Sequence, residues 1–521
     1  MMTLSLASSC MTQNFNLSGI YGTEVRNIET TLVTNYSASV PAARRYTAPS
    51  VELTNSTFCN VTVTYTHPRQ NDNIIVEAWL PVDDWNGRFQ AIGGSGYIAG
   101  RYATTYAGME GALYDGYATI TTDAGLGSAL APYPWALLSP GNVNLYNLQN
   151  LASVSLSDMA LMGKSIIKSF YGKGPEFSYW NGCSQGGRQG LMLAQRYPTL
   201  FDGIAAGSPA IFWSLAISSV QWPQKFMDML GSYPYPCELD AITAAAVSAC
   251  DGLDGVIDGI ITEIDTCLNT FDPFSLVGSS INCTEAKGVI QISKTAAAVV
   301  NATWNGEYTA NGDPVWYGLN PGADLTGSLA PPGIFAVVKT NCTTGVCVGD
   351  PNFLSSSWFQ LFVAKDPNYN LTGTTHAEFD QLGHLSQNMY RSIIGTDDPD
   401  LSEFRNAGGK LMTFHGLADE LVPPKGTEHY YKLAASMTPD IDDFYRHFEI
   451  PGLGHCYGGR SAEPTSLFEQ LRAWVENGTA PESTRVQATD PKGKTHDRVL
   501  CRYPQRMWPD GVCRAASRTG P

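Results

Sequence analysis

The pentapeptide Gly182-Cys183-Ser184-Gln185-Gly186 constrains the fold more than any other feature of the sequence, because of what flanks it. Residues 177–180 are typical of a short strand, and residues 187–197 have helical character. A serine between small residues at a strand–helix junction forms a nucleophile elbow, a tight turn that lifts the hydroxyl above a sheet. A glycine-rich turn with an ordinary serine also matches the pattern, but the flanking strand and helix favour a catalytic Ser184.

Strands alternate with helices on both sides of a long interruption. This alternation predicts a parallel sheet covered on both faces, so the expected fold class is α/β. The alternation fails after Phe212 and resumes near Gly408. The expected strands are two within 74–90 and one each at 117–122, 177–180, 410–416 and 443–450; the expected helices are 153–171, 187–197, 426–437 and 464–477.

The interruption spans about residues 211–395 and is irregular, with many Gly, Pro, Asn and Thr residues and few clean repeats. A segment of this length is too long for a loop and should form a subdomain. The expected organisation is therefore one α/β domain of residues 1–210 and 396–521, interrupted by a second domain of residues 211–395.

Composition excludes several classes of protein. With 43% hydrophobic and 15% charged residues, the chain of 521 residues can bury a large core and is not a disordered protein. The excess of 48 acidic over 32 basic side chains gives a net charge of −16, so neither nucleic acid nor an anionic membrane is an expected partner. No run of 18 apolar residues is present to predict a membrane span.

Cysteine usage indicates an oxidising compartment. The 12 cysteines form no C-x-x-C pair, so a disulfide framework in a secreted, extracellular protein is favoured over a zinc site. Met1–Ser9 has no basic residue and too short an apolar run for a full signal peptide. Glycosylation sequons agree with secretion and occur at Asn16, Asn35, Asn55, Asn60, Asn282, Asn301, Asn341, Asn370 and Asn477.

A catalytic serine needs a base and an acid that orients the base. Of the 8 histidines, His455 lies on a glycine-rich loop just after a predicted strand, where a base is expected. Asp419 follows another strand and is the preferred acid, with Glu420 as its rival. His415 is expected to be a core or supporting histidine.

Two cysteines flank these candidates in the sequence. Cys183 directly precedes Ser184, and Cys456 directly follows His455. If the serine and the histidine meet, the cysteines come close enough to form a disulfide, which would hold both side chains in place. Two independent free thiols are the alternative.

These motifs resemble those of the tannase and feruloyl esterase family of secreted α/β-hydrolases, whose hallmark is C-S-x-G-G-R with a distant Asp and His-Cys. This sequence has C-S-Q-G-G-R from Cys183 to Arg188, H-G-L-A-D ending at Asp419 and P-G-L-G-H-C ending at Cys456. The resemblance covers nearly the whole chain. It implies Ser184 as nucleophile, His455 as base and Asp419 as acid, a Cys183–Cys456 disulfide, and an insertion that acts as a lid.

Two further sites concern an oxyanion and a metal ion. The elbow places the amide of Gln185 to face a developing oxyanion. Which amide of the loop Gly93–Gly100 is the second donor stays open, and Gly94 is favoured. The stretch from Cys250 to Ile260 (C-D-G-L-D-G-V-I-D-G-I) is either a hard-cation loop or an acidic turn by its chemistry. The resemblance implies a structural Ca²⁺ held by side chains and carbonyls of Asp251, Asp254, Val256, Asp258 and Ile260.

Further disulfides follow from the same resemblance. It implies Cys250–Cys267, which would clamp the acidic loop with about 3 kcal/mol, together with Cys501–Cys513 and Cys10–Cys59. Spacing does not fix the remaining pairs, for which Cys342–Cys347 and Cys237–Cys283 are guesses.

The function implied by the resemblance is a serine carboxylic ester hydrolase that cleaves esters of phenolic acids, free or on plant cell-wall polysaccharide. A feruloyl esterase is expected first, a tannase second, and another aromatic or short-chain esterase third. A non-catalytic glycan-binding protein on a hydrolase scaffold and a serine peptidase are the alternatives from other classes. The sequence indicates no oligomeric state. Aromatic residues of the insertion either stack on a phenolic ring or form its core: Phe212, Trp213, Trp222, Phe226, Trp358, Phe359 and Phe362.

Overall fold

The computed structural model describes residues 6–17, 19–328, 335–343, 345–507 and 512–515. The first five residues of the segment Met1–Ser9 lie outside the described residues, as do the chain's last six. All 12 cysteines lie within them.

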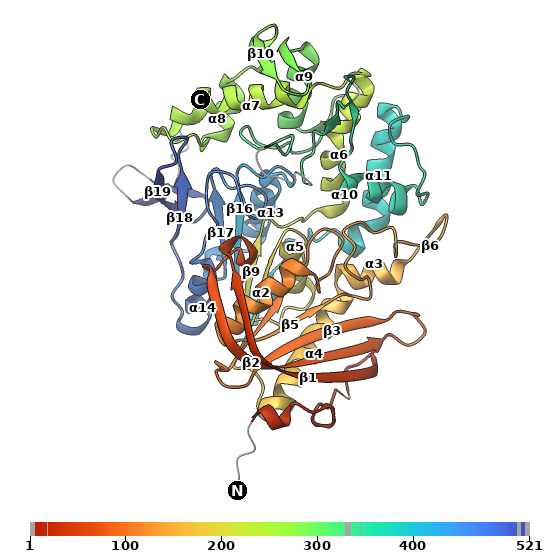
Figure 1. Cartoon of the computed structure of the whole chain (residues 1–521), viewed down its shortest axis with the longest axis vertical. Helices are drawn as coiled ribbons and strands as arrows, with labels where there is room; N and C mark the ends of the chain where they lie inside the picture. Colours follow the sequence, from red (N-terminus) through yellow and green to blue (C-terminus); the bar gives the residue numbers. More distant parts are fainter. Residues whose placement is uncertain (1–5, 18, 329–334, 344, 508–511, 516–521) are drawn as a thin grey trace.

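A central mixed sheet organises the described part of the chain (Figure 1). Its first four strands pair antiparallel and the remaining neighbours pair parallel, which confirms the predicted α/β class. In sheet order the strands are β1 (Glu24–Val40), β2 (Val51–Thr66), β3 (Ile74–Pro81), β5 (Ala118–Thr122), β4 (Arg88–Ile92), β8 (Phe177–Cys183), β9 (Gly203–Gly207), β16 (Lys410–Gly416) and β17 (Tyr445–Ile450).

Helices cover both faces of the parallel strands, because successive side chains of each strand point to opposite faces. On β8, Trp180 packs into a cluster with α4 and α5, whereas Tyr179 packs into a cluster with α14. Both clusters are buried, so the middle strands are buried on both faces, as parallel strands usually are. The helices are α2 (Ala103–Tyr114), α4 (Val154–Tyr171), α5 (Gln185–Arg196), α13 (Pro424–Met437) and α14 (Leu467–Asn477).

The long ribbon of β1 and β2 was not expected from the sequence. β1 is mostly exposed or half-buried and rich in Thr, Asn and Ser, so it lacks a clear alternation of apolar residues. It pairs with β2 through three register irregularities, and the disulfide Cys10–Cys59 anchors the N-terminal segment to β2.

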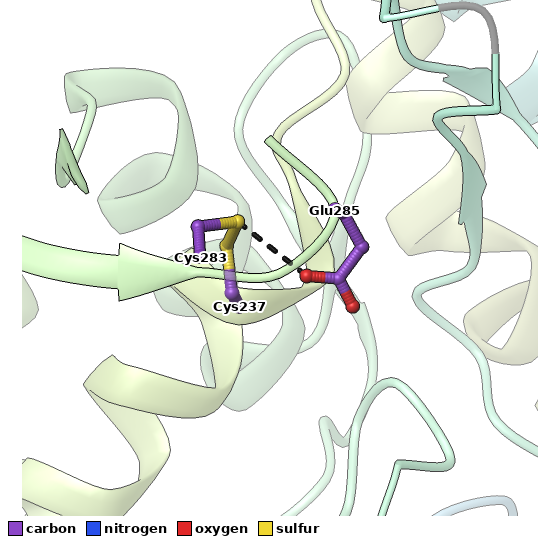
Figure 2. Close-up of side chains that lie close together, drawn as sticks. All are labelled: Cys237, Cys283 and Glu285. Carbon is purple, nitrogen blue, oxygen red and sulfur yellow. Dashed lines mark hydrogen bonds between the residues drawn. A yellow bond between two sulfur atoms is a disulfide. The ribbon is translucent and has the colours of Figure 1, made fainter. Parts of the chain in front are cut away.

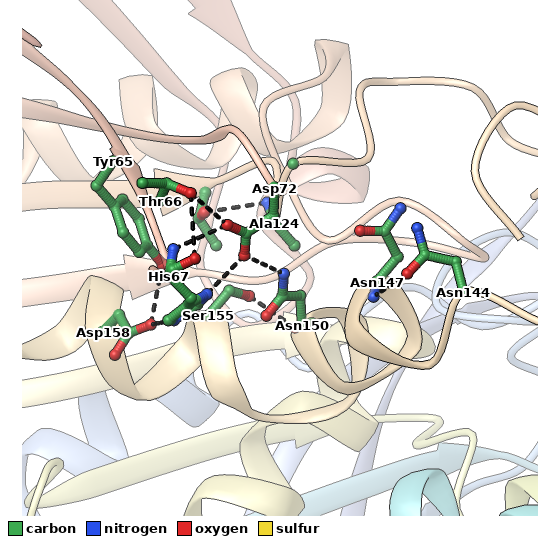
Figure 3. Close-up of polar contacts among 12 residues, drawn as sticks. Tyr65, Thr66, His67, Asp72, Ala124, Asn144, Asn147, Asn150, Ser155 and Asp158 are labelled. Atoms are coloured by element: carbon green, nitrogen blue, oxygen red, sulfur yellow. Dashed lines mark hydrogen bonds and ion pairs between the residues drawn. The ribbon is translucent and has the colours of Figure 1, made fainter. Parts of the chain in front are cut away.

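A buried polar network joins this ribbon to the helices (Figure 3). His67, just after β2, lies with Nδ1 2.6 Å from Asp72 Oδ2 and Nε2 2.9 Å from Asp158 Oδ2 on α4. Asn150 of α3 (Leu145–Ala152) donates to Asp72 as well. The hydrogen bond to Asp158 is the main reason that the pKa of His67 is raised. The network fixes the turn after β2 on helices α3 and α4.

Residues 211–395, hereafter the insert, lie beyond one end of the sheet (yellow to cyan in Figure 1). The expectation of an irregular segment is wrong, because long helices form there. Pro223 inside α6 and Gly383 inside α11 obscure the helical pattern in the sequence. The helices are α6 (Trp213–Leu230), α7 (Pro236–Cys250), α8 (Ile264–Thr270), α9 (Lys294–Asn305), α10 (Phe353–Trp358) and α11 (His376–Ile394), joined by hairpins β10–β11 (Ser280–Cys283, Gly288–Gln291), β12–β13 (Glu307–Tyr308, Pro314–Trp316) and β14–β15 (Thr340–Asn341, Val348–Gly349).

Five of the seven aromatic residues singled out in the insert belong to its core. Trp213, Trp222, Trp358, Phe359 and Phe362 are all buried in one apolar cluster. The core interpretation therefore accounts for most of them, while Trp213 also lines the candidate site described below.

After α14 the chain ends in two hairpins, β18–β19 (Ser483–Thr489, Thr495–Cys501) and β20–β21 (Gln505–Met507, Cys513–Ala515). The disulfide Cys501–Cys513 joins them. No helix within the described residues has both the length and the apolar character needed to cross a lipid bilayer.

Candidate active site

Ser184 occupies a strained turn between β8 and α5. Its backbone angles are φ 62° and ψ −121°, a conformation that non-glycine residues rarely adopt. Hydrogen bonds over-determine the turn, because Ser184 N–H donates to Gly207 of β9 and its carbonyl accepts from Arg188 and Ala210. A side chain at Gly182 would come within 2.7 Å of the Gly186 backbone, which explains the small residues around the serine.

His455 lies between Ser184 and Asp419. Its Nε2 is 2.8 Å from Ser184 Oγ, and its Nδ1 is 2.8 Å from Asp419 Oδ2. An ionised carboxylate only accepts hydrogen bonds, so Nδ1 carries the proton and Nε2 accepts from the serine hydroxyl. The structure thus brings together the three predicted residues from the ends of β8, β16 and β17.

Asp419 is completely buried and fully hydrogen-bonded. Its Oδ1 accepts the N–H groups of Leu421 (2.9 Å) and Val422 (2.8 Å), and its Oδ2 also accepts from Nε2 of His415 at 3.0 Å. His415 in turn accepts the Thr427 hydroxyl at Nδ1. His415 has the supporting position expected for it and orients the acid from behind.

The electrostatics suit a base–acid pair. Burial alone would raise the pKa of Asp419, but the positive charge of His455 and the hydrogen bonds from both histidines hold it well below its usual range. Burial lowers the pKa of His455, but the charge and hydrogen bond of Asp419, together with the charge of Glu420, raise that pKa above its ordinary value. Asp419 is therefore held in its ionised form, and its charge favours the protonated imidazolium of His455.

The prediction that Gly94 donates to the oxyanion is wrong in this geometry. The Gly94 N–H donates to the side chain of Gln189 on α5 at 2.9 Å, so it is already occupied. The Gln185 N–H opens α5 and has no partner among the described residues, which leaves it free for an oxyanion. From the glycine loop, Gly96 is the residue that lines the cavity at Ser184.

Sequence reasoning gave no role to Arg188, which fixes the start of α5. Its guanidinium is fully buried, donates to the Gln185 side chain at 2.6 Å and binds the carbonyls of Leu151 and Ala152 and the hydroxyl of Thr396. Burial without a carboxylate partner lowers the pKa of Arg188 to about 9. The only sign of this role in the sequence is a basic residue one helical turn after Ser184. Its role was missed because its partners Leu151, Ala152 and Thr396 lie far away in the sequence.

A cavity opens beside Ser184 and is almost entirely apolar. The sheet domain and the insert contribute equally to its wall, which consists of Gly96, Ser184, Ala210, Leu421, Val422 and Pro423 from the former and Ile211, Trp213, Ala216, Ile217, Val220 and Leu354 from the latter. Among the described residues of this wall, the indole of Trp213 is the only polar side-chain group apart from Ser184. Its N–H is buried and has no partner among the described residues. Phe335 packs its ring against His455 at 5.5 Å between ring centroids.

Comparison with known proteins identifies the family. The family model described as tannase and feruloyl esterase matches residues 59–518. The chain belongs to the tannase and feruloyl esterase family. It is therefore a carboxylic ester hydrolase, and the predicted family resemblance is confirmed.

Individual relatives agree with this assignment. A protein of Arthroderma benhamiae named "Probable feruloyl esterase" is 38% identical over 96% of this chain and 92% of its own length. "Probable feruloyl esterase B-1" of Aspergillus terreus is 31% identical over 84% of this chain and 80% of its own length. The solved structure of tannin acyl hydrolase from Aspergillus niger superimposes with a TM-score of 0.85 at 28% identity, covering 98% of this chain and 96% of that one.

Disulfides brace the family's catalytic centre and the insert. Cys183 and Cys456 are bonded, with a Cα–Cα distance of 5.9 Å, and tie the elbow to the histidine loop (residues 451–459). The other bonds are Cys10–Cys59, Cys237–Cys283, Cys250–Cys267, Cys342–Cys347 and Cys501–Cys513, so every expected or guessed pair is present.

One bond also rules out an apparent metal site (Figure 2). The sulfurs of Cys237 and Cys283 and a carboxylate oxygen of Glu285 lie within 4.8 Å of one another. The two cysteines are oxidised to a disulfide, however, and offer no thiolate to a metal.

The acidic loop of the insert has features that fit the calcium ion implied by the family. Asp251 Oδ1 accepts three backbone N–H groups, from Asp258 (2.9 Å), Gly259 (2.8 Å) and Ile260 (3.2 Å), which shapes the loop around the carboxylate. Asp258 Oδ1 is buried and has no hydrogen-bond partner among the described residues, as expected of an oxygen that would coordinate a cation. Asp258 Oδ2 pairs with Arg498 of β19, and Asp254 lies 3.9 Å from the same guanidinium.

The spread of these carboxylates is compatible with the same ion. The oxygens of Asp251, Asp254 and Asp258 do not form a described cluster within 4.8 Å. Opposite ligands of Ca²⁺ stand about 5 Å apart, so this spacing does not conflict with a shared ion. Side chains of these three residues and the carbonyls of Val256 and Ile260 would hold it.

Proposed function

We propose that this family member hydrolyses esters of phenolic acids, with hydroxycinnamoyl esters such as ferulates preferred, through a Ser184–His455–Asp419 acyl-enzyme mechanism. Ser184 Oγ lies 2.8 Å from the imidazole nitrogen that would take its proton. The names of the relatives support esters of phenolic acids as the substrate class. The apolar cavity wall supports a feruloyl group over a galloyl group.

In the first step, His455 would accept the Ser184 proton as Oγ attacks the ester carbonyl. Asp419 orients the ring and stabilises the imidazolium that forms, and the Gln185 N–H binds the oxyanion. His455 then protonates the departing alcohol. In the second step His455 deprotonates a water molecule that attacks the acyl carbon. The bond between this carbon and Ser184 Oγ then breaks, His455 returns the proton to Oγ, and the phenolic acid leaves.

The apolar cavity wall is the observation that favours a feruloyl over a galloyl group. Gallate carries three ring hydroxyls, and burying each without a partner costs about 1–3 kcal/mol. The described wall offers one free side-chain donor, the indole N–H of Trp213. Ferulate, with one hydroxyl and one methoxy group, needs fewer partners and presents more apolar surface.

Initial rates with methyl ferulate, caffeate, p-coumarate, sinapate and gallate test both parts of the proposal. We expect kcat/KM for ferulate to exceed that for gallate by at least about tenfold, and Ser184→Ala to abolish turnover of all five esters. Faster gallate hydrolysis would make the chain a tannase. Hydrolysis retained by the Ser184→Ala variant would contradict the mechanism. No turnover of any ester by the parent, together with no labelling of Ser184 by a fluorophosphonate, would favour a non-catalytic glycan-binding role.

Secretion and a structural calcium ion in the insert complete the proposal. All 12 cysteines are paired, which suits an oxidising extracellular environment, and the orphaned Asp258 oxygen supports the ion. The ion would supply charge compensation in the loop rather than chemistry at Ser184.

Feruloylated cell-wall polysaccharide is the corresponding natural substrate. Recovery of the protein from the culture medium tests its secretion.

A further inference from the structure

Glu420 makes direct contact with the main chain of the proposed base. It follows Asp419 in the sequence, yet its carboxylate reaches a different part of His455: Oε2 accepts the His455 backbone N–H at 2.9 Å. The residue is 9% exposed. A side chain at Gly454 would come within 3.1 Å of the same oxygen, so the histidine loop is closely fitted around this carboxylate.

Two consecutive acids thus hold one histidine at two places. Asp419 fixes the imidazole ring through Nδ1, and Glu420 fixes the backbone from which the ring projects. The disulfide Cys183–Cys456 holds the residue that follows His455. Of the two acids, Asp419 takes part in the proposed reaction, whereas Glu420 and the disulfide act on the backbone at and beside His455.

We propose that Glu420 is a positioning residue that fixes His455 through its backbone N–H and, when ionised, stabilises the imidazolium formed during ester cleavage. The proposal rests on the function proposed above, in which His455 is the general base. Glu420, the alternative to Asp419 as the catalytic acid, thereby has a separate role. Asp419 contacts the imidazole ring of His455, and Glu420 contacts its backbone N–H.

The surrounding charges give Glu420 a titration unlike that of its neighbour. Burial, and then the charge of Asp419, raise the pKa of Glu420 to about 7, while His455 acts in the opposite direction. Ionised Glu420 also contributes to raising the pKa of His455. Beyond these groups, His415 faces Asp419 from β16, and the Glu463 carboxyl interacts with Gly458 of the histidine loop.

The sign of the pH effect follows from these interactions. Below about pH 7 Glu420 is protonated and adds no charge beside His455. As the pH rises through this range, the carboxylate ionises and favours the imidazolium of the transition state. Because the two groups interact, they titrate as a coupled pair, and the rate profile reports the pair.

Glu420→Gln tests the charge while it keeps an oxygen that can accept the His455 N–H. We expect the acidic limb of the kcat/KM profile to move to lower pH, since His455 loses a neighbouring negative charge. The plateau should fall by about tenfold with KM nearly unchanged, because the lost interaction acts mainly in the transition state. Glu420→Ala, which removes the acceptor as well, should lower kcat further.

Glu463→Gln is the matched control, because Glu463 is also a glutamate with a raised pKa but interacts with Gly458 rather than with His455. Its pH profile should superimpose on that of the parent. A Glu420→Gln profile that superimposes on the parent in both limb and plateau overturns the proposal. If Glu420→Ala fails to fold, the Glu420→Gln profile alone decides.

The outcome is separable from that of the proposed function. All profiles are recorded with p-nitrophenyl acetate, an activated ester whose hydrolysis does not depend on the preferred acyl group. Failure of the substrate panel would change the ester class and leave the Glu420 comparison intact. Unchanged activity of Ser184→Ala would remove the mechanism on which both proposals rest.

Discussion

The sheet domain and the insert contribute different things to the same cavity. Ser184, Asp419 and His455 all follow strands of one sheet, and Asp419 alone accepts hydrogen bonds from two backbone N–H groups and two imidazoles. The insert supplies none of these side chains but forms half of the cavity wall, through Ile211 and residues of α6 and α10. The positions of the three catalytic side chains thus depend on the sheet and its loops. The shape of the cavity for the acyl group depends in addition on side chains of the insert.

The strongest test of this division is Asp419→Asn, which alters the sheet side only. An amide can donate to Nδ1 and would stabilise the wrong tautomer of His455, so kcat should fall by about 10⁴-fold. Kinetics with methyl ferulate measure the effect, and thermal melting checks that the fold is retained.

Asp443→Asn serves as the control for that substitution, because Asp443 is an exposed acid of the same domain at the end of a short 3₁₀ helix. Its kcat should match the parent. A fall of kcat by less than tenfold for Asp419→Asn would mean that His415 or Glu420 can replace the acid. The claim that Asp419 fixes the base in the sheet domain would then be wrong.

Calcium removal should act on the insert and leave the sheet domain's chemistry in place. If the ion is present at 100 times its Kd, chelation lowers stability by about 2.7 kcal/mol. We expect a lower Tm with EDTA and an unchanged kcat for the enzyme that remains folded. Elemental analysis of the purified protein should find the ion.

The variant Asp258→Asn should lose this sensitivity, because it alters the carboxylate with the orphaned oxygen. Asp265→Asn is its control: Asp265 is an acid of α8 that pairs with Lys425 at the surface. The calcium assignment fails if EDTA leaves the Tm of the parent unchanged and no metal is detected.

The smallest expected effect is one of selectivity, and it comes from the insert. Trp213→Phe keeps an aromatic ring in the cavity wall but removes the free indole N–H. We expect kcat/KM for methyl ferulate to fall by about tenfold relative to methyl cinnamate, which has no ring oxygen to accept a hydrogen bond.

Trp304→Phe provides the comparison, since Trp304 is also in the insert and also has a buried N–H without a described partner, but it does not line the cavity. It should leave the ratio between the two esters unchanged. Equal losses on both esters with Trp213→Phe would show that this tryptophan acts by packing alone.

The sequence predicts the sheet domain better than the insert for a physical reason. Strands such as β8 and β16 are buried runs with clear boundaries, and the elbow requires glycines at fixed positions around Ser184. The insert mixes small residues, an internal proline and short hairpins, so its helices carry weak periodic signals. The exposed ribbon strand β1 was missed for the same lack of a pattern.

Within the site, the motif residues were predictable and their partners were not. Ser184, His455 and Asp419 follow from spacing and chain order, whereas the availability of the Gly94 amide depends on a side chain from another element, Gln189. The contact of Glu420 with the His455 backbone joins residues 35 apart and leaves no trace in either local motif.

The bond between Cys183 and Cys456 also sets the order of events during biosynthesis. Its two cysteines are separated by 273 positions, and the whole insert lies between them. At about 5–20 residues per second, Cys183 remains an unpaired thiol for roughly 15–55 s after its own synthesis. Cysteines of the insert emerge first and are available as wrong partners. The disulfide that joins the nucleophile's turn to the histidine loop can therefore form only after Cys456 has been synthesised, behind the whole insert.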